Sequence, residues 1–195
     1  MKKSGPALIV HVVLTIAMIL CSIGATVNFI VGASNAVTGA EQLKNLMNVL
    51  LMLVILAMLI MGALHLLKDY SKQAAKYFKA FLLLHIVVCA LTIFIDLFFS
   101  AINTFLLFVT IRNACKAVIL LALLFWRDLG KRKSWILCGV LFALDIAALA
   151  FALIHMANVG FDFSIMGYIT ALVADGTTGL AIRGKYKDKE ARGSK

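Results

Sequence analysis

The sequence predicts an all-α polytopic membrane protein with six transmembrane helices. Of its 195 residues, 63% are hydrophobic and 14% are charged, whereas soluble domains are about 45–50% apolar and about 25% charged. Mostly apolar runs of about 18 residues or more are typical of membrane-spanning helices. The alternating segments of about ten residues that form membrane β-barrels do not occur in the sequence. Six long apolar runs are present, at residues 7–32, 46–67, 81–100, 104–126, 135–157 and 163–182.

Taken in order, the six runs differ in the charges they carry. The first two carry none and the third carries Asp96. The fourth carries Arg112 and Lys116, the fifth Asp145 and the sixth Asp175. At about 1.5 Å per residue, each run is long enough to cross the roughly 30 Å of bilayer hydrocarbon. Each is therefore expected to form one membrane-spanning helix.

The connections between the runs are short, so we expect a single transmembrane domain. Residues 101–103 and 158–162 are tight turns, which would force the runs on either side of them into antiparallel hairpins. The chain is thus expected to form three hairpins, followed by a basic cytoplasmic tail at residues 183–195.

The distribution of basic residues predicts the orientation. Lysines and arginines gather before the first run, between runs two and three, between runs four and five, and after run six; these segments hold 16 of the 19. The opposite loops hold only Lys44. By the positive-inside rule, both termini are expected to face the cytoplasm, with the chain in a bacterial cytoplasmic membrane.

The fourth run is the most informative part of the chain, because Arg112 and Lys116 lie one helical turn apart inside it. Two cations near a bilayer centre cost on the order of 5–7 kcal/mol. The apolar residues of the same run return about 4–8 kcal/mol. The run is therefore marginal alone, and acidic partners on neighbouring helices would make it stable.

The charges inside the runs alternate in sign with depth. Counted from the basic residue at the cytoplasmic end of each run, depth increases from Asp175 through Lys116, Asp145 and Arg112 to Asp96, over roughly 13 Å. Lys116 and Asp145 are expected to pair directly. The long side chain of Arg112 is expected to reach Asp96 across the hairpin of runs three and four.

In this scheme Asp175 is left over towards the cytoplasm. It begins the polar, glycine-rich segment 175–179, which predicts a break in the sixth helix. Backbone groups exposed by such a break are tolerated in a membrane only inside protein or beside water. The segment is therefore a candidate ligand or ion site.

Two interpretations of these charges stay open. In the first, the chain is a small integral membrane transport protein or transporter subunit that binds a small polar or charged solute. Arg112 and Lys116 would then contact an anion, while Asp96, Asp145 and Asp175 set their charge or relay protons. In the second, the chain is a non-enzymatic accessory or scaffold protein whose ion pairs only hold the helices together.

Histidines support a third interpretation, a metal- or haem-binding membrane protein. His11, His65 and His85 lie near the cytoplasmic ends of the first three runs, and such a set could ligate zinc or haem. No HExxH sequence or serine-protease motif is present, so an enzyme is the less favoured class and the cofactor stays open. The four cysteines lie inside runs without a CxxC pair, which argues against paired-thiol redox chemistry.

Another membrane subunit is a further candidate partner, besides the lipid bilayer and a solute. Gly24, Gly32 and Ala36 recur at multiples of four residues, a spacing that lets helix backbones approach closely. Nucleic acid is not expected as a partner. The net charge of +10 lies in short loops and tails, rather than on a basic face with stacking aromatics.

Overall fold

The computed structural model describes residues 6–67, 74–101, 103–126, 128–160 and 165–193. Within these residues the chain is all-helical, and each of its six helices contains a stretch long and apolar enough to cross a membrane. This confirms the predicted fold class of a multi-pass all-α membrane protein. The helices are α1 Pro6–Ser34, α2 Gly39–Leu67, α3 Ala74–Phe99, α4 Thr104–Phe125, α5 Lys131–Val159 and α6 Ile165–Gly193.

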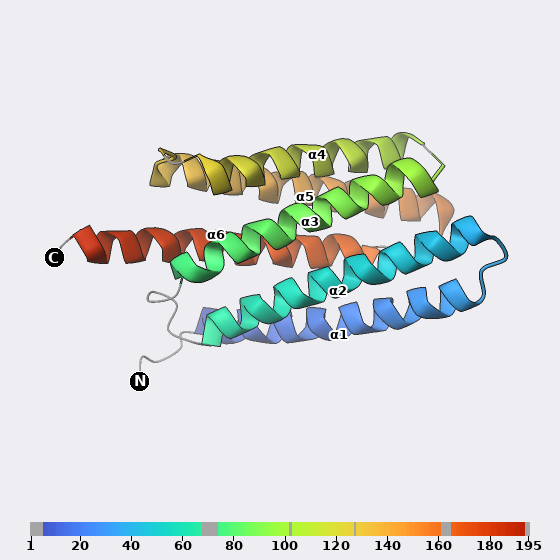
Figure 1. Cartoon of the computed structure of the whole chain (residues 1–195), viewed down its shortest axis with the longest axis horizontal. Coiled ribbons are helices and arrows are strands. Elements are labelled where there is room, and N and C mark those ends of the chain that lie inside the picture. The colour runs from blue at the N-terminus through green and yellow to red at the C-terminus, as the bar shows by residue number, and fades with distance from the viewer. Residues whose placement is uncertain (1–5, 68–73, 102, 127, 161–164, 194–195) are drawn as a thin grey trace.

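The helices lie side by side, with α3 and α6 in the middle of the bundle (Figure 1). Helix α1 packs on α2, and α4 packs on α5. Among the described residues, neither α1 nor α2 contacts α4 or α5, whereas both α3 and α6 contact helices on both sides. The first residues of α1 and the last of α6 lie at the same end of the bundle (Figure 1). We call it the basic end, because Lys79, Lys131 and Lys185 belong to it.

Two of the helix starts are fixed by side chains that satisfy free backbone amides. Thr38 precedes α2, and its hydroxyl accepts from the Glu41 amide at 3.2 Å, while the Glu41 carboxylate accepts from the Thr38 amide at 3.3 Å. This reciprocal pair is a capping box. The Asn103 side chain caps α4 by accepting from the Leu106 amide at 2.8 Å. At the end of α5, Gly160 has a φ of 103°, which glycine adopts without steric cost.

The bundle is apolar on its outer surface and keeps charged and polar side chains inside, as a protein in lipid requires. Large apolar side chains such as Leu97, Val118 and Ile146 are more than half exposed. Fully or nearly fully buried polar side chains, in contrast, include His85 and Asp145. Charged groups in hydrocarbon are expensive and face the bundle interior, so the distribution agrees with the predicted membrane setting.

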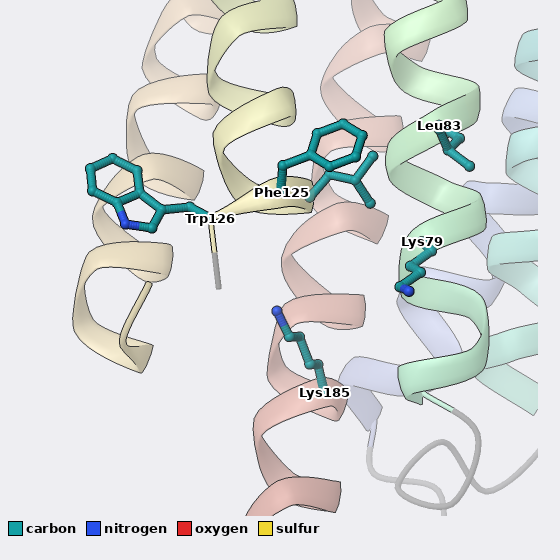
Figure 2. A pocket seen from close by; sticks show the side chains of 6 residues that line it. Lys79, Leu83, Phe125, Trp126 and Lys185 are labelled. Carbon is teal, nitrogen blue, oxygen red and sulfur yellow. The ribbon is translucent and has the colours of Figure 1, made fainter. Parts of the chain in front are cut away.

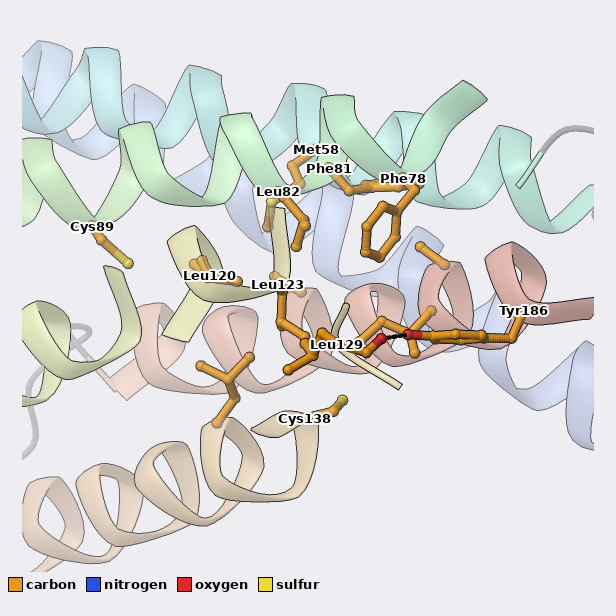
Figure 3. Close-up of a cluster of buried hydrophobic side chains, with 14 residues drawn as sticks. Met58, Phe78, Phe81, Leu82, Cys89, Leu120, Leu123, Leu129, Cys138 and Tyr186 are labelled. Atoms are coloured by element: carbon orange, nitrogen blue, oxygen red, sulfur yellow. Dashed lines mark hydrogen bonds between the residues drawn. The ribbon is translucent and has the colours of Figure 1, made fainter. Parts of the chain in front are cut away.

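Apolar packing of the interior is strongest towards the basic end. There, buried side chains of five helices meet in one cluster, which includes Phe81 of α3, Leu120 of α4 and Ile182 of α6. Figure 3 shows this cluster, together with the hydrogen bond that the Tyr186 hydroxyl donates to the Leu129 carbonyl at 2.6 Å. This core holds α3, α4 and α6 together next to the buried charges.

The predicted break in the sixth helix is wrong, because α6 is continuous through residues 175–179 and on to Gly193. The polar side chains of this segment bond back to their own helix. The Thr177 and Thr178 hydroxyls both lie within hydrogen-bond distance of the Ala174 carbonyl, at 2.6 and 3.3 Å. At Gly179 the glycine serves close packing, since a Cβ there would lie 3.2 Å from the Cys138 sulfur of α5.

The three small residues Gly24, Gly32 and Ala36 have different surroundings in the structure. Gly32 packs inside the chain, where an added Cβ would lie 3.2 Å from the Asn45 side chain of α2. Gly24 is exposed, with no atom near its Cβ position. Ala36 lies beyond the end of α1. The three positions therefore do not form one continuous helical face.

We predict that Gly179→Ala destabilises the fold relative to Gly176→Ala. Both changes replace glycine by a better helix former, worth about 1 kcal/mol. Only the methyl group at 179 meets a neighbour, Cys138, because nothing lies within 4 Å of the Cβ position at Gly176. Overpacking of this kind costs about 1–3 kcal/mol. Thermal unfolding midpoints in detergent measure the difference.

The control is the double variant Gly179→Ala/Cys138→Ala, which removes the sulfur that the new methyl group meets. The double variant is expected to be more stable than the sum of the two single-variant effects predicts, because the new methyl group no longer meets the sulfur. Equal midpoints for the two glycine variants would show that α5 and α6 can separate freely at this point.

Candidate functional site

Five ionisable side chains from four helices meet in the interior of the bundle. We call them the buried ion cluster: His85 of α3, Arg112 and Lys116 of α4, Asp145 of α5 and Asp175 of α6. None of their side chains is more than 7% exposed. The two cations and two carboxylates balance in charge when His85 is neutral.

Lys116 is the centre of the buried ion cluster. Its ammonium group lies 2.8 and 3.1 Å from the two carboxylate oxygens of Asp145, and 2.8 Å from Asp175 Oδ2. A single lysine of α4 thus bridges α5 and α6. An ammonium group has three donors, which suits two carboxylates approaching from different helices.

His85 extends the cluster to α3. Its Nε2 lies 2.8 Å from Asp175 Oδ1, and its Nδ1 lies 3.3 Å from the Thr178 hydroxyl. When His85 is neutral with its proton on Nε2, Nδ1 accepts from Thr178. When the ring is doubly protonated, Nδ1 donates to Thr178, whose hydroxyl can then turn to the Ala174 carbonyl at 3.3 Å. Both protonation states therefore keep a complete set of partners.

Arg112 lies at the other end of the cluster. Its Nε and Nη2 donate to the Asn113 side-chain oxygen at 3.1 and 2.7 Å. Its Nη1 is 3.7 Å from Asp145 Oδ1, beyond hydrogen-bond distance, and its guanidinium carbon is 5.4 Å from the centre of the Tyr168 ring. The guanidinium is thus held in place by Asn113 and Tyr168 more than by a carboxylate.

Two buried donors of this region have no acceptor among the described residues. They are Arg112 Nη1 and the Asn113 side-chain nitrogen. Arg112 is 7% exposed and Asn113 is 3% exposed, and leaving a buried donor unpaired costs about 1–3 kcal/mol, more for a charged group. The arrangement is suited to receive an acceptor oxygen of a small molecule.

Asp175 lies between His85 and Lys116. Its Oδ1 is 2.8 Å from His85 Nε2, and its Oδ2 is 2.8 Å from the Lys116 ammonium group. The carboxylate of α6 therefore links α3 to α4.

The predicted site residues are brought together in part. The expected pair of Lys116 and Asp145 is present. The expected pair of Arg112 and Asp96 is not among the ion pairs of the described residues, because the Thr110 hydroxyl donates to Asp96 at 3.2 Å and Arg112 is turned to Asn113. Asp96 therefore lies apart from the buried ion cluster.

Asp175 was expected to be left over, and this is wrong, since it contacts both Lys116 and His85. His85 was not predicted to join the charges, although a signal existed. It lies six residues from Lys79, and Asp175 lies eight residues from Arg183, so the two groups have nearly the same predicted depth.

Of the three histidines of the predicted metal site, the structure describes only the side chain of His85. The side chains of His11 and His65 lie outside the described residues. Both ring nitrogens of His85 already face a partner, Asp175 or Thr178. Among the described residues, no group of three or more His, Cys, Asp or Glu side chains is arranged to hold a metal ion.

Comparisons of this chain with family models, curated proteins and solved structures find no match. Its function is therefore inferred from its own residues.

We predict that Lys116→Met strongly destabilises the protein, because it leaves Asp145 and Asp175 buried without their shared cation. Breaking a buried ion pair from one side costs about 3–5 kcal/mol. The matched control is Lys131→Met. Lys131 is also 2.8 Å from its partner Glu190, but these side chains are 57% and 64% exposed, and an exposed pair contributes about 0–1 kcal/mol.

Thermal or denaturant unfolding in detergent measures both variants. Adding Asp175→Asn to Lys116→Met should recover part of the loss, because the remaining buried cation and carboxylate, Arg112 and Asp145, then balance in charge. Similar stabilities of Lys116→Met and Lys131→Met would contradict a central role for Lys116.

Proposed function

We propose that this chain is a small integral membrane transport protein or transporter subunit that binds a small polar or charged solute at the buried ion cluster. The observation that carries the proposal is the pair of buried donors without acceptors, Arg112 Nη1 and the Asn113 side-chain nitrogen, beside a chain of ion pairs from four helices. A purely structural network would be expected to satisfy such donors.

The donors favour a solute with an anionic or carbonyl oxygen. Arg112 offers a permanent cation, and Asn113 offers an amide donor next to it. Because Arg112 Nη1 is 3.7 Å from Asp145, a solute carboxylate can take the guanidinium without breaking a short ion pair. Lys116 stays committed to its two carboxylates.

Charge balance gives the site a direct route to proton coupling. With a neutral His85, the two cations and two carboxylates sum to zero, and one anionic solute would leave an excess negative charge in a low-dielectric interior. A proton on His85 restores neutrality, and Thr178 accommodates it without loss of partners.

The second candidate is an accessory or scaffold membrane protein with structural ion pairs. It is favoured by one specific observation, that Lys116 lies 2.8 Å from both carboxylates, so the centre of the cluster satisfies itself. Exchanging Lys116 with Asp145 does not separate the two candidates cleanly. The new aspartate at 116 would also face Asp175, so the exchange would not preserve the charge pattern.

For the orientation, we propose three hairpins with both termini in the cytoplasm of a bacterial cell. The support is the distribution of lysine and arginine, 16 of 19 in the segments that share one side. The ends of α1 and α6 at one end of the bundle (Figure 1) are consistent with this topology.

We predict that at least one small carboxylate or amino acid stabilises the purified protein, and that Arg112→Lys abolishes the effect. The variant keeps the charge but loses the planar fork that fits carboxylates. A ligand at 100 times its Kd stabilises by about 2.7 kcal/mol. A thermal-shift panel measures this, and native mass spectrometry reports any solute that co-purifies.

The exposed Arg132→Lys is the matched control, and it should respond to the same solute as the unaltered protein does. Asn113→Asp removes the amide donor but keeps an acceptor for Arg112, and should weaken the response. The accessory-protein interpretation would be preferred if no panel member shifts the unaltered protein and its native mass spectrum shows no adduct.

We predict that a green fluorescent protein fused after Lys195 is fluorescent in a bacterial host, and that alkaline phosphatase fused at the same point is inactive. Phosphatase fused after Ala36, in the connection between α1 and α2, should be active. The physical reason is the excess of cations on the side that carries the tail. The opposite pattern of activities would reverse the proposed orientation.

A further inference from the structure

A cavity lies at the basic end of the bundle, outside the buried ion cluster. Its volume is about 440 Å³, and it lies between the start of α3, the end of α4 and the last part of α6 (Figure 2). It is lined by Lys79, Leu83, Leu124, Phe125, Trp126 and Lys185.

The lining divides into a cationic part and an apolar part. In Figure 2, Lys79 and Lys185 lie on the lower side, whereas Leu83 and Phe125 lie above them. Leu83 is 51% exposed and Phe125 is 69% exposed, so the apolar wall opens towards the surroundings of the bundle. Trp126, directly after the end of α4, is also part of the lining, and its ring points away from the two lysines (Figure 2).

The two lysines bring like charges together without a counter-charge. The Lys185 ammonium group is repelled by those of Lys189 and Lys79. Neither Lys79 nor Lys185 has a carboxylate within 4 Å among the described residues. Lys185 lies over the Phe78 ring, 4.4 Å from its centre, which holds its position but supplies no negative charge. An anion between Lys79 and Lys185 would relieve the repulsion.

We propose that this cavity binds an anionic glycerophospholipid, with its phosphate head group between Lys79 and Lys185 and its acyl chains along Leu83, Leu124 and Phe125. The order of polarity matches a lipid in the membrane, because the cations lie towards the end of the bundle and the apolar wall towards its middle (Figure 2). Tryptophan at the boundary is typical of the lipid–water interface.

A soluble phosphate fits this cavity less well than a lipid does. Free phosphate would use the two lysines but would leave the exposed faces of Leu83 and Phe125 without an apolar neighbour. A lipid covers both parts. Each cation near an anionic membrane surface strengthens association by about fivefold, so a cavity with two cations is expected to discriminate clearly between anionic and zwitterionic lipids.

The two tryptophans of the chain provide the test. Trp135→Phe leaves Trp126 as the reporter at the rim of the cavity. Trp126→Phe leaves Trp135, which lies beside the exposed basic residues Arg132 and Lys133 at the start of α5. Each protein is reconstituted in phosphatidylcholine bilayers, and its fluorescence is quenched with acyl-brominated phosphatidylglycerol or acyl-brominated phosphatidylcholine.

For Trp126, half-maximal quenching is expected at a five- to tenfold lower mole fraction of brominated phosphatidylglycerol than of brominated phosphatidylcholine. Each cation contributes a factor of about five at most. For Trp135, less than a twofold difference is expected. Equal responses of Trp126 to the two lipids overturn the proposal. An equal preference at both tryptophans also overturns it, because general attraction of lipid to the basic end would then explain the result.

Two further arms locate the site and identify the source of the phosphate. Lys79→Gln/Lys185→Gln in the Trp135→Phe protein should lose the preference, while the matched Arg132→Gln/Lys133→Gln should keep it. Inorganic phosphate should displace the lipid no more than sodium chloride of equal ionic strength does; stronger displacement would assign the site to soluble phosphate instead. If the lysine variant does not fold, the comparison of the two reporters still decides.

Discussion

The structure depends most on the position of one ammonium group, that of Lys116. It lies 2.8 Å from carboxylates on α5 and on α6. The α6 carboxylate, that of Asp175, also contacts His85 of α3. A cation at this depth is tolerated only with partners, and each carboxylate is tolerated only with the cation. The packing of α3, α4, α5 and α6 therefore depends on charge neutrality within the buried ion cluster. Among the described residues, helices α1 and α2 carry no member of the buried ion cluster and contact α3 and α6 but not α4 or α5.

The sequence was sufficient for the helices and for one ion pair. Apolar runs in lipid leave the backbone few alternatives to a helix, and the counted depths of Lys116 and Asp145 agreed closely enough to predict their contact. The capping residues Asn103 and Thr38 account for two of the helix starts. These features are local or depend on depth alone, which a single sequence records.

The errors concern features that depend on which helix faces which. Asp175 was assigned to a broken segment, because glycines and threonines in a run suggest exposed backbone, whereas in the bundle Gly179 admits Cys138 and the threonines bond to their own helix. Arg112 was paired with Asp96 on reach alone, yet the neighbouring Asn113 and Thr110 supplied nearer partners. His85 is expected from the sequence only as a zinc or haem ligand, whereas in the bundle it lies against Asp175.

The Thr178 hydroxyl has a consequence for how the centre of this protein would be observed. Because it can donate to His85 Nδ1 or turn to the Ala174 carbonyl, a change of charge on the histidine requires only that one hydroxyl hydrogen rotates. At this contact the two charge states would then have the same shape. Methods that follow helix spacing would record one state, whereas vibrational spectra of the imidazole ring and the carboxylates would record two.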